Sequence, residues 1–138
     1  MKILVLNGPN LNLLGTREPE IYGTETLQDI EKRLARRAQE KGVKIRFEQS
    51  NSEGGMIDII HECRAYGGMI LNAGAYTHTS AAIRDAISGT GLKTIEVHIS
   101  NVFRREDFRH RSFLSPVCQG GIFGLGSKGY DLALEYFL

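Results

Sequence analysis

A carboxylate and an imidazole stand two positions apart in an apolar stretch of the chain, as Glu96 and His98. Because side chains alternate across a strand, both would lie on one face and their apolar neighbours on the other. Burying an ionisable pair in a parallel sheet is costly unless its members satisfy each other. A carboxylate that holds an imidazole in one tautomer also equips it for proton transfer, so the pattern favours acid–base chemistry over a purely structural pair.

A polar loop follows the apolar run 69–71 and contains Asn72 and His78. A helical pattern begins soon after, so the loop joins a buried strand to a helix N-terminus, where open α/β sheets place their ligands. His78 and His98 both follow strands and could converge there. A zinc site needs a third ligand, and the sequence has neither a His-x-x-x-His motif nor a cysteine cluster, so we expect no metal.

The segment 7–23 is too long for an ordinary connection between a strand and a helix. Its leucines and its aromatic residue could pack, so we interpret residues 10–23 as a lid rather than a disordered loop. Arg17 and Tyr22 lie within it. A guanidinium lowers the pKa of a nearby phenol, so the two could supply a tyrosinate base. Spacing alone favours the alternative, a packing tyrosine beside a solvated arginine.

A run of arginines at 104–111 follows closely on His98. Such runs are usually solvated, but here one guanidinium could face an anionic ligand, since its fork of donors suits a carboxylate. The segment 124–129 matches the glycine pattern of dinucleotide-binding proteins. Only nine residues follow it, too few for the strand and acidic residue of that motif, so we expect a tight turn and no nicotinamide cofactor.

Five strands alternating with helices are predicted to hold these residues in place. The hydrophobic periodicity predicts strands at 3–6, 43–49, 69–71, 94–100 and 121–123. It predicts helices that begin at Thr24 or Thr26, at 56, at about 79 and at 130. This alternation favours a single domain over 1–138, with a parallel, doubly wound, flavodoxin-like sheet in the order 2-1-3-4-5 between two layers of helices, a three-layer α/β/α architecture.

Composition and charge argue against several classes of function. The 138 residues suit one domain, and 41% hydrophobic with 24% charged residues is ordinary for a globular protein. A formal charge of +1 provides no basic field for nucleic acid or an anionic membrane. No apolar run suits a signal peptide or approaches the ~18 residues of a membrane span, so a cytoplasmic location is expected.

Two other classes of protein use the same sheet. A flavin- or nucleotide-binding module needs a phosphate-cradling loop after the first strand, whereas residues 7–15 offer leucines and asparagines. A non-enzymatic signalling domain would carry an acidic cluster at the strand ends, where this chain has Asn, His and Ser. Neither class accounts for the paired carboxylate and imidazole.

Five ordered motifs resemble type II 3-dehydroquinate dehydratases over essentially the whole chain. They are Asn7-Gly-Pro-Asn-Leu-Asn-Leu-Leu-Gly15 with Arg17-Glu-Pro-x-x-Tyr-Gly23, Gln49-Ser-Asn-x-Glu-Gly54 with Ile57-Asp58, Asn72-Ala-Gly-Ala-Tyr-Thr-His-Thr-Ser80, Glu96-Val-His-Ile-Ser-Asn101 and Arg105-Glu-Asp-Phe-Arg-His110. The chain departs from the family pattern at Asp107, where Glu is common, and at Gly55, where a longer residue is common. Neither residue has an expected role in the site. The resemblance implies conversion of 3-dehydroquinate into 3-dehydroshikimate by trans elimination of water through an enolate, without a cofactor.

The resemblance also implies catalytic roles. Tyr22, its phenolate favoured by Arg17, would take the proton next to the ketone. Asn10, acting through a water, would stabilise the enolate oxygen. His98, oriented by Glu96, would protonate the leaving hydroxyl. The lid would close over the site and exclude water.

Substrate contacts follow from the same resemblance. Asn72 and the backbone amides of Ile99 and Ser100 would hold the substrate carboxylate. The side chains of His78 and Arg109 would hold its hydroxyls.

The resemblance further implies a homododecamer built from trimers, in which Asp85 reaches into the site of a neighbouring subunit.

A second route to the same product uses a lysine Schiff base. Each lysine of this chain flanks a strand or lies on a polar surface or turn, so we predict no covalent intermediate.

Overall fold

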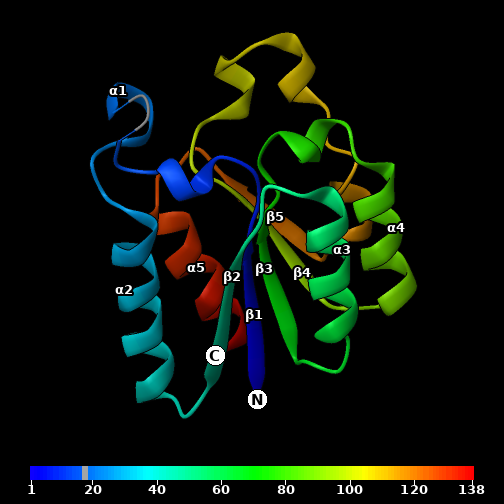
Figure 1. The fold of residues 1–138 in the computed structure, drawn as a ribbon. Helices are drawn as coiled ribbons and strands as arrows, with labels where there is room; N and C mark the ends of the chain where they lie inside the picture. Colours follow the sequence, from blue (N-terminus) through cyan, green and yellow to red (C-terminus); the bar gives the residue numbers. More distant parts are fainter. Residues whose placement is uncertain (17–18) are drawn as a thin grey trace.

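One parallel sheet organises the computed structural model, which describes residues 1–16 and 19–138, and of residues 21 and 22 only the backbone (Figure 1). Within that part of the chain the sheet has five strands, in the order β2-β1-β3-β4-β5. They are β1 (Lys2–Asn7), β2 (Lys44–Gln49), β3 (Gly68–Asn72), β4 (Thr94–His98) and β5 (Gly120–Phe123). The predicted flavodoxin-like strand order is confirmed.

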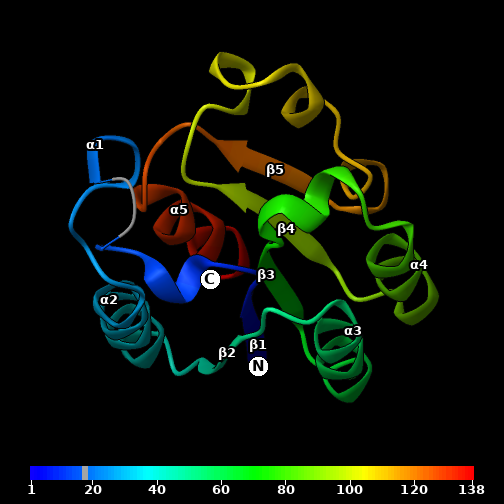
Figure 2. The same ribbon diagram turned by 45° about the horizontal axis from the view of Figure 1, so that its top comes forward.

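Helices cover both faces of the sheet, as the three-layer prediction requires (Figures 1 and 2). One face carries α2 (Leu27–Glu40) and α5 (Lys128–Phe137), and the other carries α3 (Glu53–Glu62) and α4 (Ala81–Thr90). The short α1 (Pro19–Tyr22) lies beyond the carboxyl end of the sheet. No helix in the described part of the chain is long and apolar enough to cross a membrane.

Side-chain alternation along the strands builds a core on each face. On β1, Ile3 and Val5 pack toward α2 and α5, while Leu4 and Leu6 pack toward α3 and α4. On β4 the same alternation sends apolar side chains to the α5 face. It leaves Glu96 buried on the opposite face.

Helix N-caps decide where the helices begin. Of the two predicted caps for α2, the structure uses Thr26, which forms a reciprocal capping box with Asp29. Ser52 accepts a hydrogen bond from the Gly55 N–H at 3.0 Å, so α3 begins at Glu53, three residues before the predicted start. The serine cap outweighs the poor helix propensity of the two glycines that follow.

The long connections also contain short helical turns that periodicity did not predict. They are the 3-10 turns Leu11–Leu13, Gly74–His78, Val102–Arg104, Asp107–His110 and Ser115–Val117. The predicted tight turn at 124–129 is present, with positive φ at Gly124 and Gly126, and it leads into α5.

The loops after β1 and β3 touch at Gly8. Its N–H donates to the Asn72 carbonyl at 2.8 Å. A Cβ at this position would lie 2.6 Å from the Ala73 carbonyl oxygen, which is backbone and cannot swing aside. The absence of a side chain at Gly8 therefore lets two loops meet at the carboxyl end of the sheet.

Gly8→Ala should lower the free energy of unfolding by about 1–3 kcal/mol, because the new methyl must push the two loops apart. Urea denaturation measures the change. The matched control is Gly89→Ala in α4, where nothing lies within 4 Å of the added Cβ. There alanine should stabilise by up to about 1 kcal/mol through helix propensity. Equal effects of the two substitutions would contradict the steric argument.

Candidate active site

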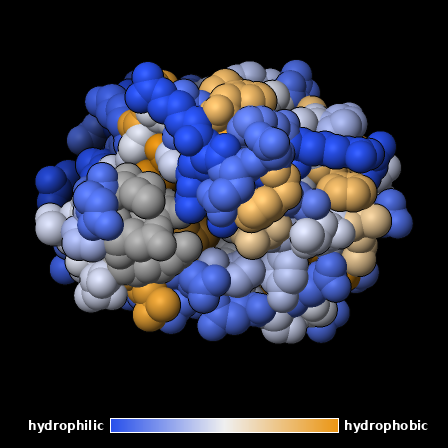
Figure 3. All heavy atoms as spheres, turned by 90° about the horizontal axis from the view of Figure 1, so that it is seen from above, coloured by the Kyte–Doolittle hydropathy of each residue, from blue (hydrophilic) through white to orange (hydrophobic). Residues whose placement is uncertain are grey.

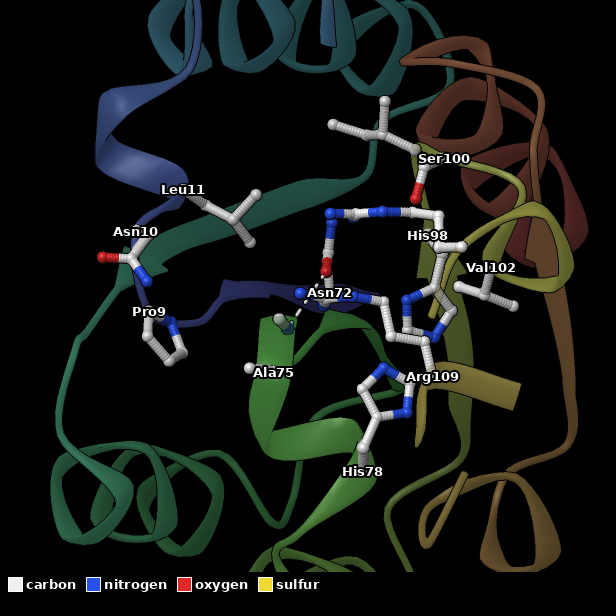
Figure 4. A pocket seen from close by; sticks show the side chains of 13 residues that line it. Pro9, Asn10, Leu11, Asn72, Ala75, His78, His98, Ser100, Val102 and Arg109 are labelled. Atoms are coloured by element: carbon white, nitrogen blue, oxygen red, sulfur yellow. Dashed lines mark hydrogen bonds between the residues drawn. The ribbon is translucent and has the colours of Figure 1, made fainter. Parts of the chain in front are cut away.

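A cavity of about 140 Å³ opens at the carboxyl ends of β1, β3 and β4 (Figure 4). It brings together seven residues expected at the site: Asn10, Asn72, His78, His98, Ile99, Ser100 and Arg109. They come from loops far apart in sequence, which the parallel sheet aligns at one edge. Figure 4 shows the rings of His78 and His98 close together on one side of the cavity, with Asn10 across from them.

Glu96 and His98 contact each other directly at the end of β4. The distance from His98 Nε2 to Glu96 Oε2 is 2.5 Å, and the two side chains are 11% and 5% exposed, respectively. Two hydroxyls also donate to this carboxylate, from Ser112 at 3.0 Å and from Ser115 at 2.5 Å. Burial raises the pKa of Glu96, but the hydrogen bonds from His98, Ser115 and Ser112 outweigh it and hold the pKa below its usual value.

This contact defines the tautomer of His98. A carboxylate only accepts hydrogen bonds, so Nε2 carries a hydrogen. Among the residues that the structure describes, none bonds to Nδ1. Since His98 lines the cavity, Nδ1 is the ring nitrogen left for a ligand, while Glu96 bonds the opposite nitrogen of the ring.

His78 is oriented by a backbone carbonyl. Its Nδ1 donates to the Arg111 carbonyl at 2.8 Å, which leaves the Nε2 lone pair free to accept. Its ring stacks on that of His98, with centroids 6.2 Å apart and planes inclined by 24°. Burial lowers the pKa of His78, and His98 and Arg109 act in the same direction, outweighing the hydrogen bond to the Arg111 carbonyl, which raises it.

One end of the cavity is built for an anion. Arg105 and Arg109 line it, and both also pair with Glu106, at 3.7 Å and 3.2 Å. No Asp or Glu among the described residues lines the cavity itself. Ile99 and Ser100 also line it, and their backbone N–H groups donate to no residue in the described part of the chain. Cationic side chains and unpaired amides together make a carboxylate or phosphate the favoured ligand.

The Asn10 loop is fixed by side chains at the end of β2 and just after it. Asn10 has a left-handed backbone (φ 71°), and its N–H donates to Asn51 Oδ1 at 3.0 Å. Gln49 Nε2 reaches the Gly8 carbonyl at 3.1 Å and Asn51 Oδ1 at 3.1 Å. These bonds hold a sparsely populated conformation that turns Asn10 onto the cavity.

Three expected site residues, Arg17, Tyr22 and Asp85, are not among the described residues that line the cavity. Arg17 and the side chain of Tyr22 fall outside the described residues. The backbone of α1 lies near the anion end, because its Glu20 lines a second hollow together with Ile99 and Ser100. Asp85 is exposed on α4 and does not line the cavity of its own chain.

Several residues at the site escaped sequence reasoning. Ser112 and Ser115 bind Glu96 from a distant loop, and no local pattern marks them. Arg105 also lines the cavity, whereas only Arg109 was predicted to contact the ligand. No three His, Cys, Asp or Glu side chains gather as a metal site in the described ranges.

Replacing Ser112 and Ser115 together by alanine should raise the pKa of Glu96, because burial is then opposed by His98 alone. Above the unfolded pKa of about 4.3, the wild type should be more stable than the variant by about 1–3 kcal/mol. That advantage should shrink as the pH falls through the lowered native pKa. Urea denaturation from pH 3 to 8 measures it. A pH-independent difference would contradict the assignment.

Comparisons with known proteins identify the family of the chain. The model of the family described as dehydroquinase class II matches residues 1–138. Proteins named 3-dehydroquinate dehydratase from Dinoroseobacter shibae and Bacillus pumilus are 57% and 54% identical over 98% of this chain, and 91% and 92% of their own lengths are covered. The crystal structure of the type II dehydroquinase from Butyrivibrio crossotus superposes with a TM-score of 0.96 at 49% identity, covering 99% of this chain and 97% of that one. The chain belongs to the class II dehydroquinase family.

Proposed function

We infer that this chain is a 3-dehydroquinate dehydratase, a hydro-lyase that acts by trans elimination. A base removes the proton from the carbon next to the ketone, and the electron pair of that C–H bond forms an enolate. The enolate then expels the hydroxyl from the adjacent carbon, and an acid protonates this leaving group, so that water and a conjugated enone result.

The inference rests on one observation: His98, Ile99 and Ser100 are consecutive in the chain and line the same cavity. In 3-dehydroquinate the leaving hydroxyl and the carboxylate share one carbon. The acid and the carboxylate site must therefore be neighbours. The chain places a carboxylate-bound imidazole and two backbone amides, unpaired among the described residues, in consecutive residues that line one cavity.

Acid catalysis is assigned to His98. Its Nδ1 faces no partner among the described residues, and Glu96 stabilises the cationic ring from the other side. His78 Nε2 accepts a hydrogen bond from a substrate hydroxyl, and the Arg109 guanidinium donates hydrogen bonds to the same substrate. No lysine among the described residues lines the cavity, which supports a non-covalent route.

Base catalysis is assigned to Tyr22, with Arg17 lowering the pKa of its phenol. The position of α1 beside Ile99 and Ser100 supports this assignment. Asn10, acting through a water, supports the enolate oxygen. Residues 10–23 act as the lid that brings Tyr22 over the substrate and excludes water.

The wild type should produce an enone from 3-dehydroquinate in metal-free buffer, seen as rising ultraviolet absorbance. Tyr22→Phe should lower kcat by about 10²–10⁴-fold with a small change in KM, because it removes the base and keeps the ring. Tyr136→Phe, on the exposed face of α5, is the control and should match the wild type. A near-normal kcat for Tyr22→Phe would remove it as the base, and an inactive wild type would remove the function itself.

We further propose that the chain assembles as a homododecamer of trimers, with Asp85 completing the site of a neighbouring subunit. Two features support self-association. Asp85 is exposed and does not line the cavity of its own chain. The surface around the carboxyl ends of the strands carries apolar patches (Figure 3), and its exposed apolar residues include Phe103, Phe108, Phe123 and Leu125. The cytoplasmic location stays a prediction.

Mixing two weakened variants tests the shared site. Asp85→Ala and His98→Ala should each lower activity, and co-refolding them should restore part of it, because some sites then draw intact residues from both chains. Light scattering should give a twelve-chain mass. A fully active monomer, or mixtures no more active than the average of the two variants, would contradict the shared site.

A further inference from the structure

Tyr130 of α5 is fully buried and binds two asparagines at once. Its hydroxyl donates to Asn7 Oδ1 at 2.5 Å and accepts from Asn72 Nδ2 at 2.9 Å. Tyr130 does not line the cavity, whereas Asn72 does. A buried polar chain thus runs from the α5 layer to the floor of the site.

The sheet register explains why the three residues meet. Asn7 and Asn72 are direct neighbours in the pairing of β1 with β3. Each continues the strand face whose earlier residues pack toward α5, so both amides point to the same helix. The position of α5 is fixed in turn by Arg33 of α2, which binds both carboxylate oxygens of Asp131 at 2.8–3.0 Å.

The direction of these hydrogen bonds determines how the Asn72 amide is turned. A tyrosine hydroxyl has one hydrogen, and here Asn7 takes it, so toward Asn72 the hydroxyl can only accept. Asn72 must therefore present its NH₂ group to Tyr130. The Gly74 N–H donates to Asn72 Oδ1 at 3.2 Å, the bond drawn as a dashed line in Figure 4, and fixes the other end of the amide.

Asn72 lines the same cavity as Ile99 and Ser100, and an amide held in this way has one N–H without a partner among the described residues. We propose that Tyr130 is a positioning residue for substrate affinity: it fixes Asn72 so that this N–H, and not the side-chain oxygen, faces the substrate carboxylate. The inference rests on the proposed function, because it needs a carboxylate in this cavity.

Tyr130 is suited to this task and unsuited to proton transfer. Burial raises the pKa of its hydroxyl far above the usual value, so the hydroxyl keeps its hydrogen throughout the working pH range. The two tyrosines thus have different roles. The Tyr22 phenol acts as a base only after it loses its proton, whereas the Tyr130 hydroxyl positions Asn72 only while it keeps its proton.

The test is Tyr130→Phe, which keeps the ring and removes the hydroxyl. KM for 3-dehydroquinate should rise on the order of tenfold, and the inhibition constant of the product 3-dehydroshikimate should rise by a similar factor. kcat should stay within about twofold, because the carboxylate is bound equally in the ground and transition states. Tyr136→Phe on the same helix is the matched control and should leave both constants unchanged.

A double-mutant cycle separates positioning from a general loss of stability. In an Asn72→Ala background, Tyr130→Phe should have no further effect on KM, because the residue through which it acts is gone. Asn7→Ala, which frees the Tyr130 hydrogen to turn toward Asn72, should raise KM in the same direction and serves if Tyr130→Phe does not fold.

The inference is overturned by three results. These are an unchanged KM in Tyr130→Phe, a fall in kcat alone, or an equal effect of Tyr130→Phe with and without Asn72. Failure of the proposed function is distinguishable, since the wild type would then show no turnover of 3-dehydroquinate.

Discussion

The buried carboxylate of Glu96 is the constraint on which the site depends. An isolated charge inside a sheet is costly, so each Glu96 oxygen must be bonded. His98 supplies one bond from the same strand, and Ser112 and Ser115 supply two from a loop that must fold back over β4. The position of that loop and the orientation of the imidazole therefore depend on the same carboxylate. The same loop carries Arg105 and Arg109, so satisfying the buried charge also delivers the cations of the anion site.

The negative charge of Glu96 and the positive charges of the arginines lie on different sides of His98. Glu96 lies behind His98, bonded to Nε2, whereas Arg105, Arg109, Ile99 and Ser100 line the cavity on the ligand side. The polar groups at the ligand face are themselves held from behind. Asn72 is fixed through α5, and Asn10 through the residues that follow β2. Such support is what keeps hydrogen-bond donors oriented before the substrate arrives.

Sequence periodicity predicted the strand order and the helix layers because each strand and helix has a clear inner face. It placed the start of α3 three residues late, because the Ser52 cap is a side-chain interaction and not a hydrophobic one. It also paired Glu96 with His98, which a period of two makes neighbours. It could not find Ser112, Ser115 or Tyr130, because their partners are distant in sequence and only the folded chain brings them together. Asn7 was the one visible signal: an amide that ends the buried face formed by Ile3 and Val5.

The most direct test of the account is a crystal structure with 3-dehydroshikimate bound. The account predicts the ligand carboxylate on Asn72 Nδ2 and the N–H groups of Ile99 and Ser100. It predicts His98 Nδ1 beside the carbon that lost its hydroxyl, with Glu96 still bound to Nε2 and Tyr22 on the opposite side of the ring. A carboxylate at the far end from His98, or a Glu96 turned away from the imidazole, would contradict it.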